Sequence, residues 1–360
     1  MIRLFSGLVL VASIAVGYAA GQLVAPPVAS SARDAAVTSS QATMVPLEPG
    51  DVALAAISDR ADGAWVLARQ ERAASAVLYH VASAGQARIV LPAPSAGRLG
   101  GLAQDPTGTV WVGVGTRLVA VGEATGGILR EITLPPAQHV ASRAQRAPDG
   151  TVLGLGQVST VAATADGVWV GRYAATELTF VDRVGNVTAA ALSQSVDAKT
   201  FTTDLAGTVW FTTNFGPSDQ LGAFIGRIES ATHAITLTPI VVASLAAGSG
   251  GIHALSREWR ELDGAGAVVA SRPVPPQGDV TTTVITAKGE LVLRGLRQAA
   301  LHLYDKRGAE VRQIQYAAGS FIGYGGATLP STARLAFLVA TTRGRTWFAP
   351  EGSSFIYYFS

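Results

Sequence analysis

Short apolar stretches of about strand length alternate with Gly-containing turns from about residue 43 to the end of the chain. In the clearest units an Asp opens the turn, and a Gly and then a Trp follow, as at Asp105, Gly108 and Trp111. Gly provides a positive φ and Asp bonds to its own backbone, so each unit predicts a tight hairpin between two strands. The pattern therefore predicts an all-β protein.

This hairpin belongs to a longer repeat. An apolar strand precedes the turn, the Trp strand follows it, a third strand leads to a Gly (as in 178–185), and a fourth ends at a Pro (as in 130–135). The Trp position recurs at residues 65, 111, 169, 210, 253, 292 and 347, with His253 and Val292 replacing Trp in two copies. Four short antiparallel strands repeated at this period describe one propeller blade. The sequence predicts a seven-bladed β-propeller of four-stranded blades over residues 42–360.

The two ends of the repeat array complement each other. The last copy stops after 355–360, which matches a third strand, so its fourth strand is missing. Residues 42–47 look like a fourth strand without a blade of its own. We expect this segment to complete the last blade and close the ring, which leaves no terminal blade that needs a cap. We expect the repeated Trp side chains to fill the space between blades rather than to bind a ligand.

Two copies carry extra residues. One insertion covers about 138–156 and contains an additional Asp-Gly turn, and the other covers about 316–330 and is rich in Gly and aromatic residues. Insertions in a repeat array usually occupy loops, often on the binding face.

The first 41 residues differ from the rest. Residues 1–25 form an apolar run that follows a single basic residue, Arg3, and this pattern predicts either a cleaved signal peptide or an uncleaved membrane anchor. Residues 26–41 are rich in Pro, Ala and Ser and predict a flexible linker. We therefore expect an extracytoplasmic protein, either secreted or attached to the membrane by this segment alone.

Composition narrows the function classes. The net charge is only +2 and 14% of residues are charged, so nucleic acid is not an expected partner. The chain has no Cys, which excludes disulfides, thiolate zinc sites and a Cys nucleophile. Nothing in the sequence indicates an oligomer, and we expect a monomer.

One copy carries a family resemblance. Residues 204–213, 224–229 and 235–239 resemble the repeat of the streptogramin B (virginiamycin B) lyase-like family of seven-bladed propellers. The resemblance implies a lyase that opens a cyclic depsipeptide lactone by elimination, with a divalent metal such as Mg²⁺ held by His and Glu around the central channel. The chain departs from that family at position 213, where Thr replaces the family's Glu. Its His residues at 80, 139, 233, 253 and 302 have no metal-ligand spacing, so we predict no metal site.

Candidate ligand-binding residues lie where propellers usually meet ligands, in the connections after the second strands and between blades. These positions combine basic, aromatic and amide side chains that can bind an anionic or sugar-like ligand. We expect their side chains to be solvated, so that Arg172→Ala and Arg257→Ala would weaken a ligand without loss of stability. The candidates are Arg69, Arg172, Tyr173, Asn214, Arg257, Lys199, Asp279 and His139.

The sequence favours a non-enzymatic binding or scaffold module without a cofactor, with a small molecule, a glycan or an envelope protein as its partner. One alternative is a metal-dependent lyase or hydrolase resembling the streptogramin B lyases. A second alternative is a membrane-tethered sensor ectodomain, although no signalling domain accompanies the single apolar segment.

Overall fold

The computed structural model describes residues 38–70, 75–82, 85–91, 99–141, 144–193, 196–213, 224–276, 278–295, 299–316, 321–322, 328–329 and 335–360. The predicted signal peptide or anchor (1–25) and most of the predicted linker lie outside these residues. Every regular element in the described part is a β-strand, and none of its segments is a helix that could cross a membrane.

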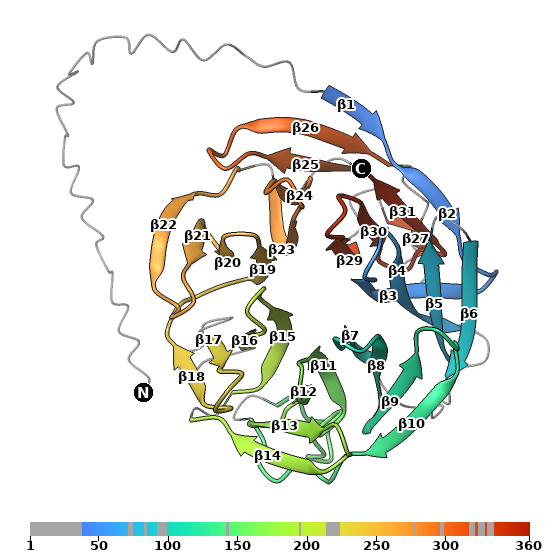
Figure 1. Ribbon diagram of the computed structural model, residues 1–360, viewed down its shortest axis with the longest axis vertical. Coiled ribbons are helices and arrows are strands. Elements are labelled where there is room, and N and C mark those ends of the chain that lie inside the picture. Colours follow the sequence, from blue (N-terminus) through green and yellow to red (C-terminus); the bar gives the residue numbers. More distant parts are fainter. Residues whose placement is uncertain are drawn as a thin grey trace, which may run out of the picture. The chain divides into compact units, whose positions relative to one another are not determined.

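Seven sheets stand around a central axis, which confirms the predicted seven-bladed propeller (Figure 1). Within each blade the consecutive strands pair antiparallel from the innermost to the outermost. The strands of blades 1 to 3 are β3 (Asp51–Ser58), β4 (Ala64–Gln70), β5 (Ala76–Ala82) and β6 (Gly85–Leu91); β7 (Leu99–Gln104), β8 (Thr109–Val114), β9 (Arg117–Gly122) and β10 (Ile128–Thr133); and β11 (Val158–Ala163), β12 (Gly167–Arg172), β13 (Glu177–Asp182) and β14 (Val187–Ala191).

Blades 4 to 7 follow the same order. Their strands are β15 (Ala198–Thr203), β16 (Val209–Thr213), β17 (Ile225–Ile228) and β18 (Ile235–Thr238); β19 (Ser244–Gly248), β20 (Gly251–Leu255), β21 (Glu258–Leu262) and β22 (Val268–Pro273); β23 (Gly278–Ile285), β24 (Leu291–Gly295), β25 (Ala300–Tyr304) and β26 (Glu310–Gln315); and β29 (Leu335–Ala340), β30 (Thr346–Pro350) and β31 (Phe355–Phe359), with β2 (Thr43–Pro46) outermost in blade 7.

The Asp and Trp of the repeat are bonded to each other, which accounts for their spacing. Asp105 accepts bonds from the backbone N–H of Thr107 and Thr109 through Oδ1, and from Trp111 Nε1 through Oδ2 at 3.1 Å. Gly108 adopts a φ of 95°, a conformation that costs glycine little. One carboxylate therefore caps the turn and also orients the indole that follows it.

The N-terminal strand closes the ring as predicted. β2 pairs antiparallel with β31, from Thr43 opposite Tyr358 to Pro46 opposite Phe355, and supplies the fourth strand of blade 7. The chain then crosses directly to the innermost strand of blade 1. Leu47, at this crossing, is buried in the same cluster as Trp347 and Ile356, so one hydrophobic core spans the seam between the first and last blades.

The linker prediction is wrong at its C-terminal end. Residues Thr38–Gln41 form strand β1, which pairs in parallel with β26 and adds a fifth strand to blade 6. A polar stretch can form such a strand because backbone hydrogen bonds, rather than buried side chains, hold it on a sheet edge. The described residues of β1 are accordingly exposed.

The repeated Trp side chains are structural, as predicted, since all five in second strands are buried between blades: Trp65, Trp111, Trp169, Trp210 and Trp347. The insertions differ in form. The first contains a short turn closed by a bridge between Arg146 and Val152, and the second contains the two-residue strands β27 (Phe321–Ile322) and β28 (Thr328–Leu329).

Candidate functional site

The propeller has two unlike faces. The turn face carries the turns between first and second strands and between third and fourth strands, most of which are short. The loop face carries the connections between second and third strands and those between blades. Both insertions, between β10 and β11 and between β26 and β29, belong to the loop face. The loop face therefore carries the longer and more varied connections.

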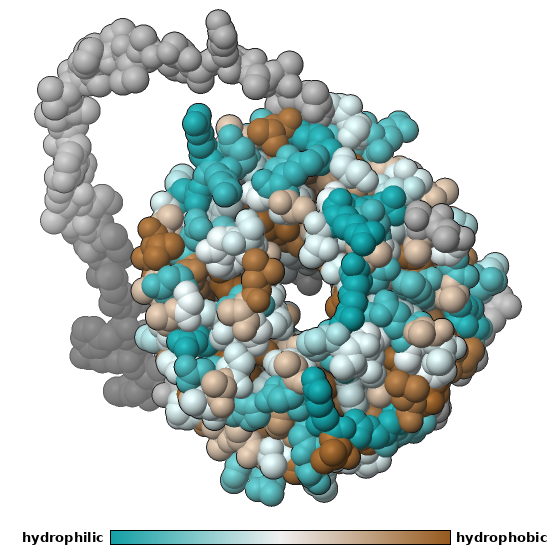
Figure 2. Space-filling model, viewed as in Figure 1, coloured by the Kyte–Doolittle hydropathy of each residue, from teal (hydrophilic) through white to brown (hydrophobic). Residues whose placement is uncertain are grey.

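A central cavity of about 1000 Å³ lies toward the turn face, since the turns between first and second strands line it. Figure 2 shows an opening at the centre of the ring. Residues near the ends of all seven innermost strands line it, and small apolar side chains such as Ala56, Ala103, Ala162 and Ala246 recur around it. Polar residues such as Ser58, Gln104 and Thr203 line it as well, so the cavity is mixed in character.

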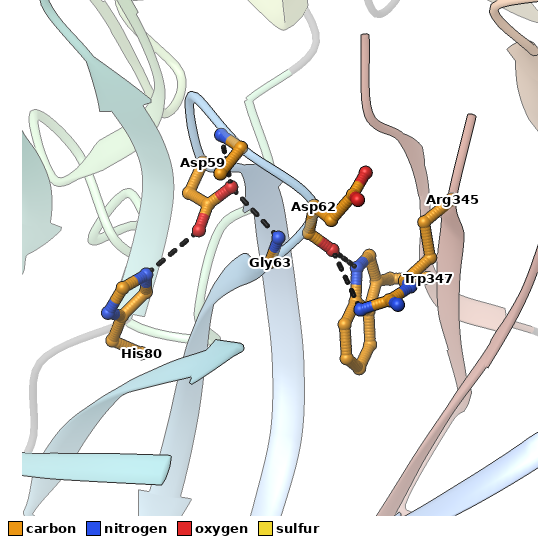
Figure 3. A network of polar contacts seen from close by, with 7 residues as sticks. Asp59, Asp62, Gly63, His80, Arg345 and Trp347 are labelled. Atoms are coloured by element: carbon orange, nitrogen blue, oxygen red, sulfur yellow. Dashed lines mark hydrogen bonds and ion pairs between the residues drawn. The ribbon is translucent and has the colours of Figure 1, made fainter. Parts of the chain in front are cut away.

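The carboxylates at this cavity are already engaged by the protein. Asp59 is buried, accepts bonds from the N–H groups of Ala61 and Gly63, and lies 2.9 Å from His80 Nε2 (Figure 3). Asp105 and Asp204 each cap their own turn and a Trp indole. In the part of the chain that the structure describes, no three His, Asp or Glu side chains are grouped to hold a metal ion. The described residues therefore do not fit the divalent metal that the lyase resemblance implies.

Arg172 does not lie where the sequence predicted. Its side chain is 1% exposed at the end of β12, rather than solvated at the mouth of the channel. The guanidinium donates to the carbonyl oxygens of Gly156 (3.1 Å) and Pro135 (2.5 Å), and contacts the buried carboxylate of Glu177 at 3.4 Å. Burial lowers the pKa of Arg172, and the charge of Glu177 opposes that shift. This buried position contradicts the predicted solvated side chain. Because the side chain bonds to both ends of the first insertion, we expect its removal to cost stability.

Two other predicted residues flank this buried pair. Tyr173 is half-buried, and its backbone bonds to Gly156 and Gln157 at the end of the insertion. His139 is exposed within the insertion, and its carbonyl oxygen accepts a bond from Thr176 N–H. The fold therefore brings Arg172, Tyr173 and His139 together, but only His139 presents its side chain openly to solvent.

The remaining candidates are distributed over other blades. Arg69, Lys199 and Arg257 are exposed on the loop face, in blades 1, 4 and 5. Asp279 instead forms an ion pair with Arg294 inside blade 6. Burial favours the neutral form of Asp279, yet the bonds from Arg294 and Thr281 keep its pKa below the ordinary value. Asn214 lies outside the described residues.

Sequence reasoning missed Glu177, the acceptor that makes the buried Arg172 tolerable. Glu177 is 3% exposed, and its Oε1 also accepts a bond from Gln138 N–H at 3.2 Å. The sequence places Glu177 at the start of the third strand, just across the connection from Arg172. This position alone does not indicate that the two side chains are buried as a pair.

Four of the five His side chains have structural partners. His80 pairs with Asp59, His233 with Asp166 at 2.5 Å, and His302 with Glu310 at 2.7 Å. His253 occupies a Trp position and is 8% exposed, and its Nδ1 accepts a bond from Trp259 Nε1 at 2.9 Å. Only neutral imidazole can accept this bond.

Acid is expected to destabilise blade 5 through His253. Burial lowers its pKa below 6.5; the charge of Glu261 opposes the shift, and those of Arg272 and Lys306 add to it. The unfolded chain then takes up a proton near pH 6.5 that the folded chain refuses, so stability present above pH 6.5 is lost as pH falls toward the folded pKa. The loss reaches at most about tenfold in the unfolding constant per pH unit. Denaturant unfolding from pH 7.5 to 5 measures it, and His253→Leu should lack this part of the pH dependence.

No protein-family model and no curated protein matches the sequence. Solved structures match over most of their length. A streptogramin B lyase has a TM-score of 0.63 at 14% identity, over 88% of this chain and 97% of that one. Virginiamycin B lyase from Staphylococcus aureus has a TM-score of 0.61 at 16% identity, over 88% and 98%. A chain of the mitotic checkpoint complex has a TM-score of 0.63 at 12% identity, over 96% and 98%. The predicted resemblance is thus confirmed at the level of the fold: this chain is a seven-bladed propeller similar to the streptogramin B lyases.

Proposed function

We propose that the chain is an extracytoplasmic propeller that works as a binding or scaffold module, with the loop face as its recognition surface. One observation carries the proposal, namely that the buried guanidinium of Arg172 fixes the insertion between β10 and β11 over this face.

The Arg172–Glu177 ion pair is buried. Desolvating an ion pair is unfavourable, and a well-packed apolar pair is often at least as stable. The insertion is also unnecessary for the ring, because most of the other connections between blades carry no insertion. The Arg172–Glu177 pair nevertheless holds this insertion in one conformation. Such a fixed insertion is consistent with a preorganised recognition element.

The chemistry of the exposed candidates suggests the partner. Arg69, Lys199 and Arg257 offer cationic donors, and His139 projects from the insertion. Such donors suit an anionic small molecule, a glycan with acidic groups or an envelope protein with an acidic patch. The apolar pattern of residues 1–25 supports export, which would place this partner outside the cytoplasm.

Site-specific photo-crosslinking in the native host tests the proposal. A photoreactive amino acid at His139 on the loop face is expected to capture one discrete partner, whereas the same group at Ala206, exposed in a turn of blade 4, is expected to capture none. Arg69→Gln, Lys199→Gln and Arg257→Gln should weaken the His139 adduct. Equal capture from both positions would contradict recognition through the loop face.

A metal-dependent lyase is the second candidate, because two of the similar folds reported above are streptogramin B lyases. Against it, Thr213, which stands where the lyase repeat has Glu, is fully buried. The carboxylates beside the central cavity are also committed to turns and to His80. Elimination needs a base near the proton it removes and a cation near the developing enolate, and no described group of residues supplies both.

A further inference from the structure

The turn face is electrically divided. In blades 6, 7 and 1, the exposed charged residues in the described turns are all basic: Arg60, Lys288, Lys306, Arg307 and Arg343. In blades 2 to 5 the exposed charged residues of the described turns are Asp166, Arg183, Glu229 and Asp263. We refer to the five basic residues of blades 6, 7 and 1 as the basic crescent.

None of the acidic residues in the same turns is fully exposed. Asp59 is buried against His80, and Asp62 is half-buried and accepts a bond from Thr341 Oγ1 at 3.3 Å. Asp305 accepts the N–H groups of Arg307 and Ala309 within its own turn. Glu290 is half-buried and lies 3.7 Å from Arg312 on the outer strand. Of the crescent itself, Arg60 donates to a carbonyl oxygen, that of Asp105 at 2.7 Å, which leaves its charge unneutralised.

Two contacts join turns within the crescent. Gly289 and Lys306 line one small cavity, which joins the two turns of blade 6. Across the seam, Trp347 Nε1 and Arg345 donate to the carbonyl oxygen of Asp62, which joins the turns of blades 7 and 1 (Figure 3).

Strand β1, on the outer edge of blade 6, begins on the side of this surface. β1 runs parallel to β26, with Thr38 opposite Arg312 and Gln41 opposite Gln315. β26 itself begins directly after the turn that carries Lys306 and Arg307. The N-terminal end of β1, at Thr38, therefore lies toward that turn. Twelve residues, 26–37, separate Thr38 from the apolar segment and can reach at most about 40 Å.

We propose that the basic crescent docks on an anionic lipid bilayer, so that the turn face of blades 6, 7 and 1 rests on the membrane and the loop face points away from it. The inference rests on the extracytoplasmic location proposed above, and on residues 1–25 being the uncleaved membrane anchor that the sequence offers as one of two alternatives. A retained apolar anchor would hold the turn of blade 6 near the lipid surface, where each Lys or Arg is attracted to anionic headgroups. The tether and the charges thus select one orientation, with the recognition surface exposed.

The absence of Cys from the chain gives a clean test. A single fluorophore is attached to the full chain at Ala287→Cys, in the turn beside Lys288, or at Ser193→Cys on the loop face; both positions are exposed. The chain is reconstituted in vesicles with a headgroup quencher, either of phosphatidylcholine alone or with phosphatidylglycerol added. We expect phosphatidylglycerol to raise quenching several-fold at 287 and not at 193, and high salt to remove the difference.

Two triple variants with equal charge change complete the design. Lys288→Gln, Lys306→Gln and Arg307→Gln together should weaken docking on the order of 100-fold and abolish the effect at 287. Arg69→Gln, Lys199→Gln and Arg257→Gln on the loop face should leave it unchanged. Quenching at position 287 that is the same with and without phosphatidylglycerol would contradict the proposal. So would binding of the basic crescent to soluble polyglutamate that lowers the quenching equally in both kinds of vesicle. Photo-crosslinking at position 139 tests partner recognition by the loop face separately. Failure of membrane docking can therefore be distinguished from failure of the proposed binding function.

Discussion

Replacing Arg172 by alanine is expected to lower the free energy of unfolding by about 3–5 kcal/mol, the range for breaking a buried ion pair. The substitution leaves the carboxylate of Glu177 buried without its cation, and frees the carbonyl oxygens of Gly156 and Pro135. Denaturant unfolding followed by tryptophan fluorescence measures the change.

Arg69 offers a matched control, because it lies near the end of the second strand of blade 1 but is exposed. Arg69→Ala should change stability by no more than about 0.5 kcal/mol. The pair Arg172→Met and Glu177→Leu should recover part of the loss, since it removes both charges and keeps apolar volume. Equal effects of Arg172→Ala and Arg69→Ala would show that the buried network does not hold the insertion.

Replacing Thr43–Pro46 by a Gly-Ser sequence of the same length is expected to cost about 3 kcal/mol. The change removes β2 from the edge of blade 7, and loosens Val45 and Leu47 from the seam cluster that contains Ile356 and Trp347. Burying one such aliphatic side chain contributes about 1.5–3 kcal/mol. Unfolding curves and limited proteolysis at the seam measure the loss of closure.

The same replacement of Thr38–Gln41 is the natural control. β1 only adds a fifth strand to a blade whose four strands are already complete, and its described side chains are exposed. This change should cost less than about 1 kcal/mol, since surface substitutions rarely cost more. If β1 proved as costly to remove as β2, ring closure would not depend on the seam.

The blades could be predicted from sequence because their signal is local and repeated. The turn of Asp105 and the indole of Trp111 form one bonded unit, and seven related units imply one ring. Closure by residues 42–47 followed from counting strands, since the last copy was one strand short. Burial of His253 followed from its place in the Trp position.

The candidate site was far less predictable. Arg172 and Arg69 occupy similar places in the repeat, yet one is 1% exposed and the other is open to solvent. The difference arises from the insertion that folds over Arg172 and from Glu177, neither of which the repeat pattern describes. Strand β1 was not predicted, because it pairs with β26 through backbone hydrogen bonds. Any polar sequence can make such bonds, so the side chains of 38–41 give no signal.

The most direct test of a binding module against a lyase is a calorimetric titration of the full chain with Mg²⁺ and Mn²⁺, combined with an assay for opening of a cyclic depsipeptide lactone. Because the described carboxylates at the channel are held by their own turns and by His80, we predict no saturable metal binding and no lactone opening. Saturable binding of either metal together with metal-dependent turnover would contradict the proposed function and establish the propeller as an enzyme.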